Sequence, residues 1–137
     1  MEAQKQNEID AKAIQDYIAK KGLKAQKTED GLYYVVDSAG TGPKPQAGKK
    51  VTVNYTGKLL DGSIFDSSLK PGRTPFDFQL GVGQVIKGWD EGIQLFNVGS
   101  KGTLLIPSSL GYGSRGAGGA IPPNSVLIFE IQVLKAE

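Results

Sequence analysis

Two side chains that dominate catalysis near neutral pH are missing from this sequence of 137 residues, which contains no histidine and no cysteine. Without imidazole there is no ordinary general base near pH 7. Without a thiol there is no thiolate nucleophile, no disulfide and no thiolate metal site. We therefore expect neither a metal nor a cofactor, and we favour a reaction that needs no proton transfer.

Strong charge of one sign and long apolar runs are also missing. Sixteen Lys and Arg against fourteen Asp and Glu give a net charge of +2 without a basic stripe, so nucleic acid is not an expected partner. The longest apolar run, Val126 to Ile131, is interrupted by Glu130 and is too short to span a membrane. The first residues lack a signal-peptide pattern. The sequence predicts a soluble protein, cytoplasmic as written, or periplasmic or in the cell envelope if a signal peptide has been removed.

The N-terminal segment, Glu2 to Lys21, predicts one amphipathic helix because most of its residues are good helix formers. The apolar side chains that fall along one stripe at helical spacing are Ile9, Ala13, Ile14, Tyr17 and Ile18. Gly22 can end the helix in the left-handed conformation. The stripe can pack on the rest of the chain, or it can form a homodimer or another partner contact.

From residue 28 onward the pattern changes from helical to β. Val51, Val53 and Tyr55 alternate with polar residues, which predicts a half-buried antiparallel strand. Asp61-Gly62 predicts a type I′ hairpin turn, in which both central residues need positive φ. Similar patterns predict further strands at residues 32–37, 64–66, 76–80, 103–106 and 127–133. We expect two parts, a helical extension over 1–27 and a β-rich domain over 28–137.

A glycine-marked segment, residues 81–92, holds the only tryptophan. It predicts a loop that runs into a short helix and presents Val85, Ile86 and Trp89 as the floor of an apolar pocket. We expect that helix to end at Gly99.

A second glycine-rich segment, residues 108–124, predicts a long loop with Tyr112 as its main anchor, and long ordered loops usually carry function. Several short antiparallel strands with one short helix indicate an α+β domain in which the sheet curls around the apolar face of the helix.

Five motifs in this body resemble, in order and nearly in spacing, those of the FK506-binding-protein type of peptidyl-prolyl isomerase. They are Val53 to Gly57, Phe65 to Ser68, Gly81 to Trp89, Gly111 to Gly113, and Ile121 to Phe129. The resemblance covers about residues 31–137 and implies a five- or six-stranded antiparallel half-barrel wrapped around a short helix. The N-terminal helix is similar to extensions of some bacterial members, where they can mediate dimerisation.

The resemblance implies a pocket with two kinds of residue. The catalytic set it implies is Tyr55, Phe65, Asp66, Trp89 and Tyr112, and the substrate-binding set is Phe76, Val85, Ile86, Ile121, Phe129 and Arg73. In the family, the main-chain N–H at the position of Ile86 and the hydroxyl at that of Tyr112 bind ligand carbonyls. The resemblance leaves open whether Arg73 is the arginine that pairs with Asp66, because the loop between them is about one residue longer than in familiar members.

The implied activity is cis-trans isomerisation of X-Pro bonds in peptides and unfolded proteins, with binding of macrolides of the FK506 and rapamycin type. Two other functions stay open. Ala117 and Ala120 stand where some members carry larger side chains, which favours a binding module or chaperone with little turnover. A structural β-domain that assembles through its helix is the third possibility, since each aromatic residue taken singly is typical of a core.

Overall fold

One curled antiparallel sheet forms the framework of the protein in this computed structural model, which describes residues 2–137 and the side chains from residue 5 onward. Its strands are β1 (Gln26–Lys27), β2 (Tyr33–Ser38), β3 (Lys50–Lys58), β4 (Ile64–Ser67), β5 (Phe76–Gln79), β6 (Lys101–Ile106) and β7 (Leu127–Ala136). The strand order is β1-β2-β6-β7-β3-β4, and β5 also pairs with β3. The predicted α+β half-barrel is confirmed, and its seven strands include the two-residue β1, which no sequence pattern indicated.

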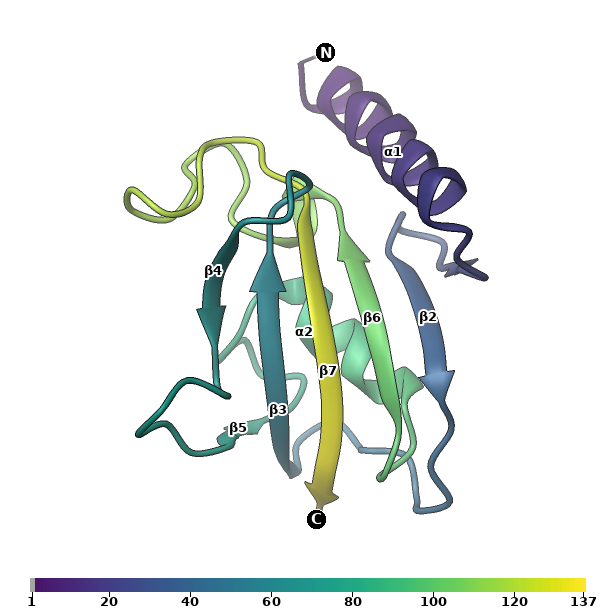
Figure 1. The fold of residues 1–137 in the computed structure, drawn as a ribbon, viewed down its shortest axis with the longest axis vertical. Helices are drawn as coiled ribbons and strands as arrows, with labels where there is room; N and C mark the ends of the chain where they lie inside the picture. Colours follow the sequence, from purple (N-terminus) through teal and green to yellow (C-terminus); the bar gives the residue numbers. More distant parts are fainter. Residues whose placement is uncertain (1) are drawn as a thin grey trace.

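The two helices lie on opposite faces of the sheet (Figure 1). The short helix α2 (Lys87–Gly92) and the 3-10 turn η1 (Ile93–Leu95) pack on the main core, which the inward side chains of β3, β6 and β7 complete. The long helix α1 (Glu2–Lys21) packs on the other face, over β2, β6 and β7. No helix in residues 2–137 is long and apolar enough to cross a bilayer.

The alternation predicted for β3 is confirmed. Val51, Val53 and Tyr55 are buried, while the residues between them are half-exposed. The hairpin that follows β3 does form, but its predicted turn type is wrong. Only Gly62 has positive φ (88°), and its N–H donates to the Leu59 carbonyl at 3.0 Å. The Asp61 carboxylate instead accepts a hydrogen bond from the Ser63 N–H at 2.9 Å, which holds Asp61 out of the left-handed region.

The predicted end of the second helix is also wrong. α2 ends at Gly92 and η1 at Leu95, because Phe96 turns to an extended conformation and buries its ring in the core. Gly99 has a φ of 93° but serves a turn before β6, where its N–H donates to the Val133 carbonyl at 2.8 Å.

The bounds of α1 agree with the prediction, and Gly22 ends it with a φ of 66°. Its buried stripe is rotated relative to the predicted one. Ile14 is fully buried against β2, β6 and β7, but Ile9 is 60% exposed and Asp10 only 2% exposed. The rotation places the Asp10 carboxylate against Ser108, whose N–H and hydroxyl both donate to it.

Replacing Ile14 by alanine is expected to lower the free energy of unfolding by about 3 kcal/mol, because a fully buried side chain leaves a cavity under α1. Urea unfolding measures the change. Ile9→Ala on the same helix is the control and should change stability by less than about 0.5 kcal/mol, since that side chain is exposed. Equal effects of the two substitutions would contradict the packing described for α1.

A carboxyl pair joins the loop before β2 to α2. The hydrogen bond with Asp30 is the main reason that the pKa of Glu91 is raised to about 7, with burial and the charge of Asp30 adding to it. The same hydrogen bond lowers the pKa of Asp30. Between pH 4.5 and about 7 the folded protein thus keeps a proton on Glu91 that the unfolded chain has lost.

Stability is therefore expected to fall as pH rises from 4.5 to 7, since the folded state binds more protons in that window. Glu91→Gln keeps a donor toward Asp30 and removes the titration, so it should flatten this part of the profile. Urea unfolding at several pH values measures the slope, and Glu29→Gln is the control that should leave it unchanged. A wild-type slope in Glu91→Gln would show that the pair does not carry the effect.

Candidate functional site

An aromatic cavity of about 400 Å³ opens between the sheet, α2 and the long loop after β6. It is lined by Tyr55, Phe65, Asp66, Phe76, Gln84, Val85, Ile86, Trp89, Tyr112, Ala117, Ala120, Ile121 and Phe129. Ten of the eleven site residues predicted from the sequence are in this set. Arg73 is the exception, and it reaches the edge of the cavity through Asp66 and Tyr55.

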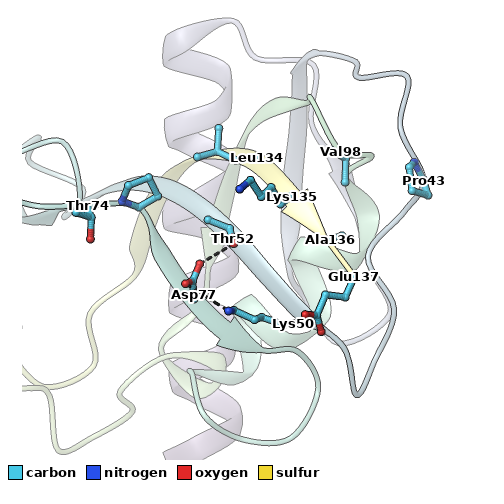
Figure 2. Close-up of a pocket in the computed structure, with 11 residues that line it drawn as sticks. Pro43, Lys50, Thr52, Thr74, Asp77, Val98, Leu134, Lys135, Ala136 and Glu137 are labelled. Atoms are coloured by element: carbon cyan, nitrogen blue, oxygen red, sulfur yellow. Dashed lines mark hydrogen bonds and ion pairs between the residues drawn. The ribbon is translucent and has the colours of Figure 1, made fainter.

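A larger depression of about 750 Å³ lies at the far end of β3 and β7 (Figure 2). None of the predicted site residues lines it, and it has no aromatic wall. Its charged groups are partly paired with one another: Lys50 lies 3.7 Å from Asp77, which also accepts a 2.6 Å hydrogen bond from the Thr52 hydroxyl. The aromatic cavity is the better candidate, because ligand sites combine apolar walls with a few convergent polar groups.

Trp89 forms the base of the cavity and is only 4% exposed. The rings of Tyr55 and Phe129 each stand edge-on to the indole, with centroids 5.1 Å away. Phe65 meets Phe129 at 5.4 Å, also edge to face. Such pairs are favourable beyond the area they bury, so the walls form a rigid aromatic box. The indole N–H has no acceptor among the described residues.

Two glycines bring Trp89 close to the sheet. A Cβ at Gly88 would lie 2.7 Å from the Ile106 side chain, and one at Gly92 would lie 2.6 Å from that of Leu104. Any larger residue at either position would push α2 away from β6. The close approach fixes the depth of the indole under the cavity.

Asp90 organises the loop that leads into α2, a role that the sequence patterns did not reveal. Its carboxylate accepts hydrogen bonds from the N–H groups of Gly81 at 2.8 Å and Gly83 at 3.0 Å. Both glycines have φ near 80°, which other residues rarely adopt. The sequence signal for this role was the presence of two glycines shortly before a helix that has an aspartate in its first turn. The loop in turn presents Val85 and Ile86 to the cavity.

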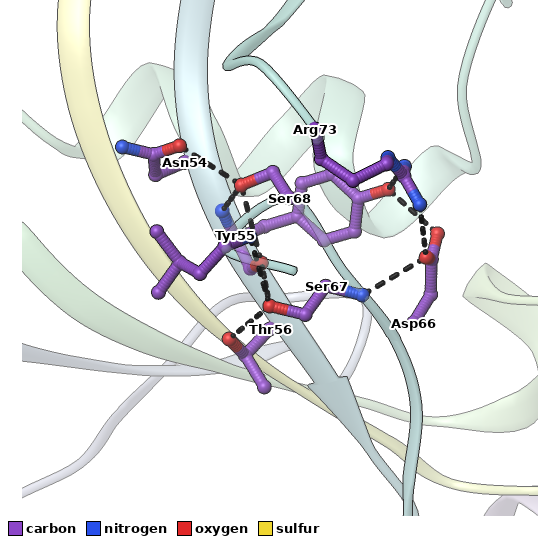
Figure 3. Close-up of polar contacts among 8 residues, drawn as sticks. Asn54, Tyr55, Thr56, Asp66, Ser67, Ser68 and Arg73 are labelled. Carbon is purple, nitrogen blue, oxygen red and sulfur yellow. Dashed lines mark hydrogen bonds and ion pairs between the residues drawn. The ribbon is translucent and has the colours of Figure 1, made fainter. Parts of the chain in front are cut away.

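The polar edge of the cavity is a closed network of three side chains (Figure 3). The Tyr55 hydroxyl donates to Asp66 at 2.6 Å, and Arg73 donates to Asp66 at 3.1 Å and to the Tyr55 hydroxyl at 3.3 Å. The Ser67 N–H adds a fourth bond, at 2.9 Å to Asp66. Arg73 thus pairs with Asp66, a contact that the sequence left open.

This network controls the charge of Asp66. Partial burial raises the pKa of its carboxyl, but the hydrogen bonds from Tyr55, Arg73 and the Ser67 N–H outweigh burial and hold the pKa below its ordinary value. Burial, followed by the bond to Asp66, raises the pKa of the Tyr55 hydroxyl. At neutral pH the cavity therefore has an ionised carboxylate and a neutral phenol at its edge.

Hydrogen bonds behind the network tie β3 to the end of β4. The Tyr55 N–H donates to the Ser68 hydroxyl at 2.9 Å, and that hydroxyl donates to the Asn54 side chain at 2.9 Å (Figure 3). The hydroxyls of Ser67 and Thr56 lie 2.9 Å apart. These contacts fix Tyr55 and Asp66 relative to each other.

The long loop over residues 107–126 forms the rim and is called the flap below. It begins with the 3-10 turn η2 (Ser108–Leu110) and carries Tyr112, which is 40% exposed. Farther along, Ala117 and Ile121 exchange two backbone hydrogen bonds of 2.8 and 3.2 Å, so the flap folds back on itself. This places Ile121 in the cavity wall with Ala117 and Ala120 beside it.

The fold and the cavity together define a class of small half-barrel domains that hold an aromatic pocket over a short helix. Residues 42–134 match the sequence pattern of the family described as FKBP-type peptidyl-prolyl cis-trans isomerase, and the chain belongs to that family.

Two curated relatives show different extents of similarity. FK506-binding protein 1 of Dictyostelium discoideum is 49% identical over 104 residues, which are 76% of this chain and 96% of that protein. The FKBP-type peptidyl-prolyl cis-trans isomerase FkpA of Aeromonas hydrophila is 49% identical over 127 residues, 90% of this chain and 45% of that protein. The chain therefore spans less than half the length of the Aeromonas relative.

Among solved structures, FkpA from Escherichia coli superposes with a TM-score of 0.80 at 38% identity, over 97% of this chain and 63% of that one. The likeness to that structure therefore extends beyond residues 42–134 and includes part of the N-terminal segment.

Proposed function

We propose that this protein catalyses cis-trans isomerisation of X-Pro bonds in peptides and unfolded chains, and that it assists protein folding in this way. The observation that carries the proposal is the aromatic cavity of about 400 Å³ with Trp89 at its base and an ionised carboxylate at its edge. X-Pro bonds are the substrate class because only they have a cis population large enough for such catalysis to be useful.

Rotation of a peptide bond needs no reactive side chain. Its barrier of about 18–20 kcal/mol exists because resonance separates charge, with negative charge on oxygen and positive charge on nitrogen. Twisting the bond removes that separation, so water stabilises the planar ground state more than the twisted transition state. A dry aromatic cavity withdraws part of this stabilisation and so lowers the barrier.

The residues around the cavity suit distinct roles in this reaction. The proline ring would lie on Trp89 between the aromatic walls, and the main-chain N–H of Ile86 and the hydroxyl of Tyr112 would hold the flanking carbonyls in a twisted conformer. Asp66 would act as a fixed negative charge and not as an acid, since its three hydrogen bonds keep it ionised.

Proline-limited refolding of a model protein, together with protease-free kinetics on a series of X-Pro peptides, tests the proposal. We expect acceleration at micromolar enzyme and competition by a macrolide of the FK506 type, which we propose binds the same cavity. No acceleration of either reaction would overturn the proposal.

A second function is favoured by one observation. Ala117 and Ala120 make the flap side of the cavity open, which suits retention of proline-containing segments without rapid turnover. Peptide binding in the micromolar range, with turnover below about a tenth of that of a related isomerase, would favour this binding module over the enzyme. A tenfold lower rate corresponds to about 1.4 kcal/mol of lost transition-state stabilisation.

The assembly and the division of the chain stay predictions. We propose an extension over 1–27 and an isomerase domain over 28–137, although β1, at the end of the extension, pairs with β2 of the domain. We also propose that the exposed side of α1, which carries Ile9, can contact a second copy. Sedimentation equilibrium before and after removal of residues 1–22 tests this. If the number of chains per particle is the same in both proteins, a dimer through α1 is excluded.

A further inference from the structure

Asp10 is a buried carboxylate that the proposed reaction does not use directly. It is 2% exposed, and it lies on the face of α1 that packs on the sheet. One of its oxygens accepts two hydrogen bonds from Ser108, from the N–H at 2.9 Å and from the hydroxyl at 2.5 Å. The other oxygen accepts a bond of 2.7 Å from the Gln6 side chain.

Docking of the helix does not require a carboxylate at this position. The apolar contacts of Ile14 with the side chains of β2, β6 and β7 already bury the helix face. A buried carboxylate is costly unless it is fully hydrogen-bonded, and replacement by an apolar side chain is often neutral for stability. The position of Asp10 therefore points to its partner, Ser108, which is 98 residues away in the sequence.

Ser108 is the first residue of η2, where the flap begins. Its carbonyl accepts hydrogen bonds from the N–H of Gly111 at 3.0 Å and from that of Gly113 at 2.8 Å. These two glycines flank Tyr112, so the same residue that Asp10 holds also holds the backbone on both sides of the tyrosine. The path from α1 to the rim of the cavity thus consists of four hydrogen bonds.

We propose that Asp10 is a positioning residue for the isomerase reaction. Asp10 holds Ser108 and thereby fixes where Tyr112 lies at the rim of the cavity. The inference rests on the proposed function for its catalytic part. Its structural part, that α1 orders the start of the flap, stands independently of turnover.

The catalytic test compares Asp10→Ala and Asp10→Asn in X-Pro peptide kinetics. We expect kcat/KM to be about fivefold lower in Asp10→Ala, because a displaced Tyr112 would lose one neutral hydrogen bond to the substrate. In Asp10→Asn we expect kcat/KM within about twofold of wild type, because asparagine keeps an acceptor for Ser108. In a Tyr112→Phe background, Asp10→Ala should lower kcat/KM by less than about twofold, because the hydroxyl it positions is gone.

A merely structural role would give different results. Ile14→Val weakens the packing of the same helix without touching Ser108, so it should leave kcat/KM unchanged. Should Asp10→Ala fail to fold, Ser108→Ala provides the second variant, since it removes the hydroxyl bond and keeps the N–H bond. Wild-type kcat/KM in folded Asp10→Ala would overturn the catalytic part. The same would follow if Asp10→Ala lowered kcat/KM by the same factor in the wild-type protein and in the Tyr112→Phe background.

Amide hydrogen exchange provides a readout that needs no activity. In Asp10→Ala the amide of Gly113 should exchange at least about tenfold faster than in wild type, while that of Leu105 in β6 should keep its rate. Unchanged exchange at Gly113 would overturn the whole inference. Faster exchange at Gly113 in a protein that shows no isomerase activity would instead contradict the proposed function and retain the link from α1 to the flap.

Discussion

Replacing both Phe65 and Asp66 by alanine is expected to lower kcat/KM for X-Pro isomerisation by at least about a hundredfold. Phe65 supplies apolar wall whose burial is worth about 1.5–3 kcal/mol, and loss of the Asp66 carboxylate leaves the Tyr55 hydroxyl and Arg73 without their acceptor, at about 1–3 kcal/mol. A combined loss of about 3 kcal/mol corresponds to a hundredfold. Proline-limited refolding and protease-free peptide kinetics measure it.

Asp77→Ala is the matched control for the charge change. Asp77 also accepts a hydroxyl bond and pairs with a basic side chain, but it lies outside the aromatic cavity. Near-wild-type kcat/KM is expected in this control. If the double variant kept its fold, as judged by near-ultraviolet circular dichroism, and retained wild-type kcat/KM, the reaction would not occur in this cavity.

Local patterns in the sequence place several aromatic residues on the core side of the fold, whereas their grouping into one pocket was implied by the resemblance of the motifs to the FK506-binding-protein family. Tyr55 and Phe129 alternate on strands that face the core, and Trp89 follows a loop that glycines mark as a tight turn. Strand alternation and helix spacing are local properties, so these side chains could be assigned to the same side of the sheet without coordinates.

The pairing of Arg73 depended on a loop whose length alone did not settle the register. In the structure the Arg73 N–H donates to the Lys70 carbonyl at 3.0 Å, and Gly72 has a φ of 80°. This tight turn takes up the additional residue and returns the guanidinium to Asp66. A glycine just before the arginine permitted such a turn, but the sequence did not show that it forms.

The buried stripe of α1 could not be predicted correctly for a different reason. Apolar character favoured Ile9 as a buried residue, whereas the helix is rotated so that Asp10 is buried. The partner that makes this burial favourable, Ser108, belongs to a loop on the far side of the sequence. Periodicity within a helix carries no information on such a partner.

A large loss of stability is expected at a glycine within the sheet. In Gly102→Ala the new Cβ would lie 2.2 Å from the Phe96 ring and 2.5 Å from the Val35 carbonyl oxygen. The ring is 1% exposed and the carbonyl belongs to the neighbouring strand β2, so neither can move away freely. We expect the free energy of unfolding to fall by about 4 kcal/mol, which is above the usual range for overpacking.

Gly119→Ala is the matched control for this substitution, because nothing lies within 4 Å of a Cβ at that position in the flap. It should change the free energy of unfolding by less than about 0.5 kcal/mol. Urea unfolding of both variants measures the difference. A Gly102→Ala protein with the wild-type midpoint would contradict the close packing of Gly102 against Phe96 and β2.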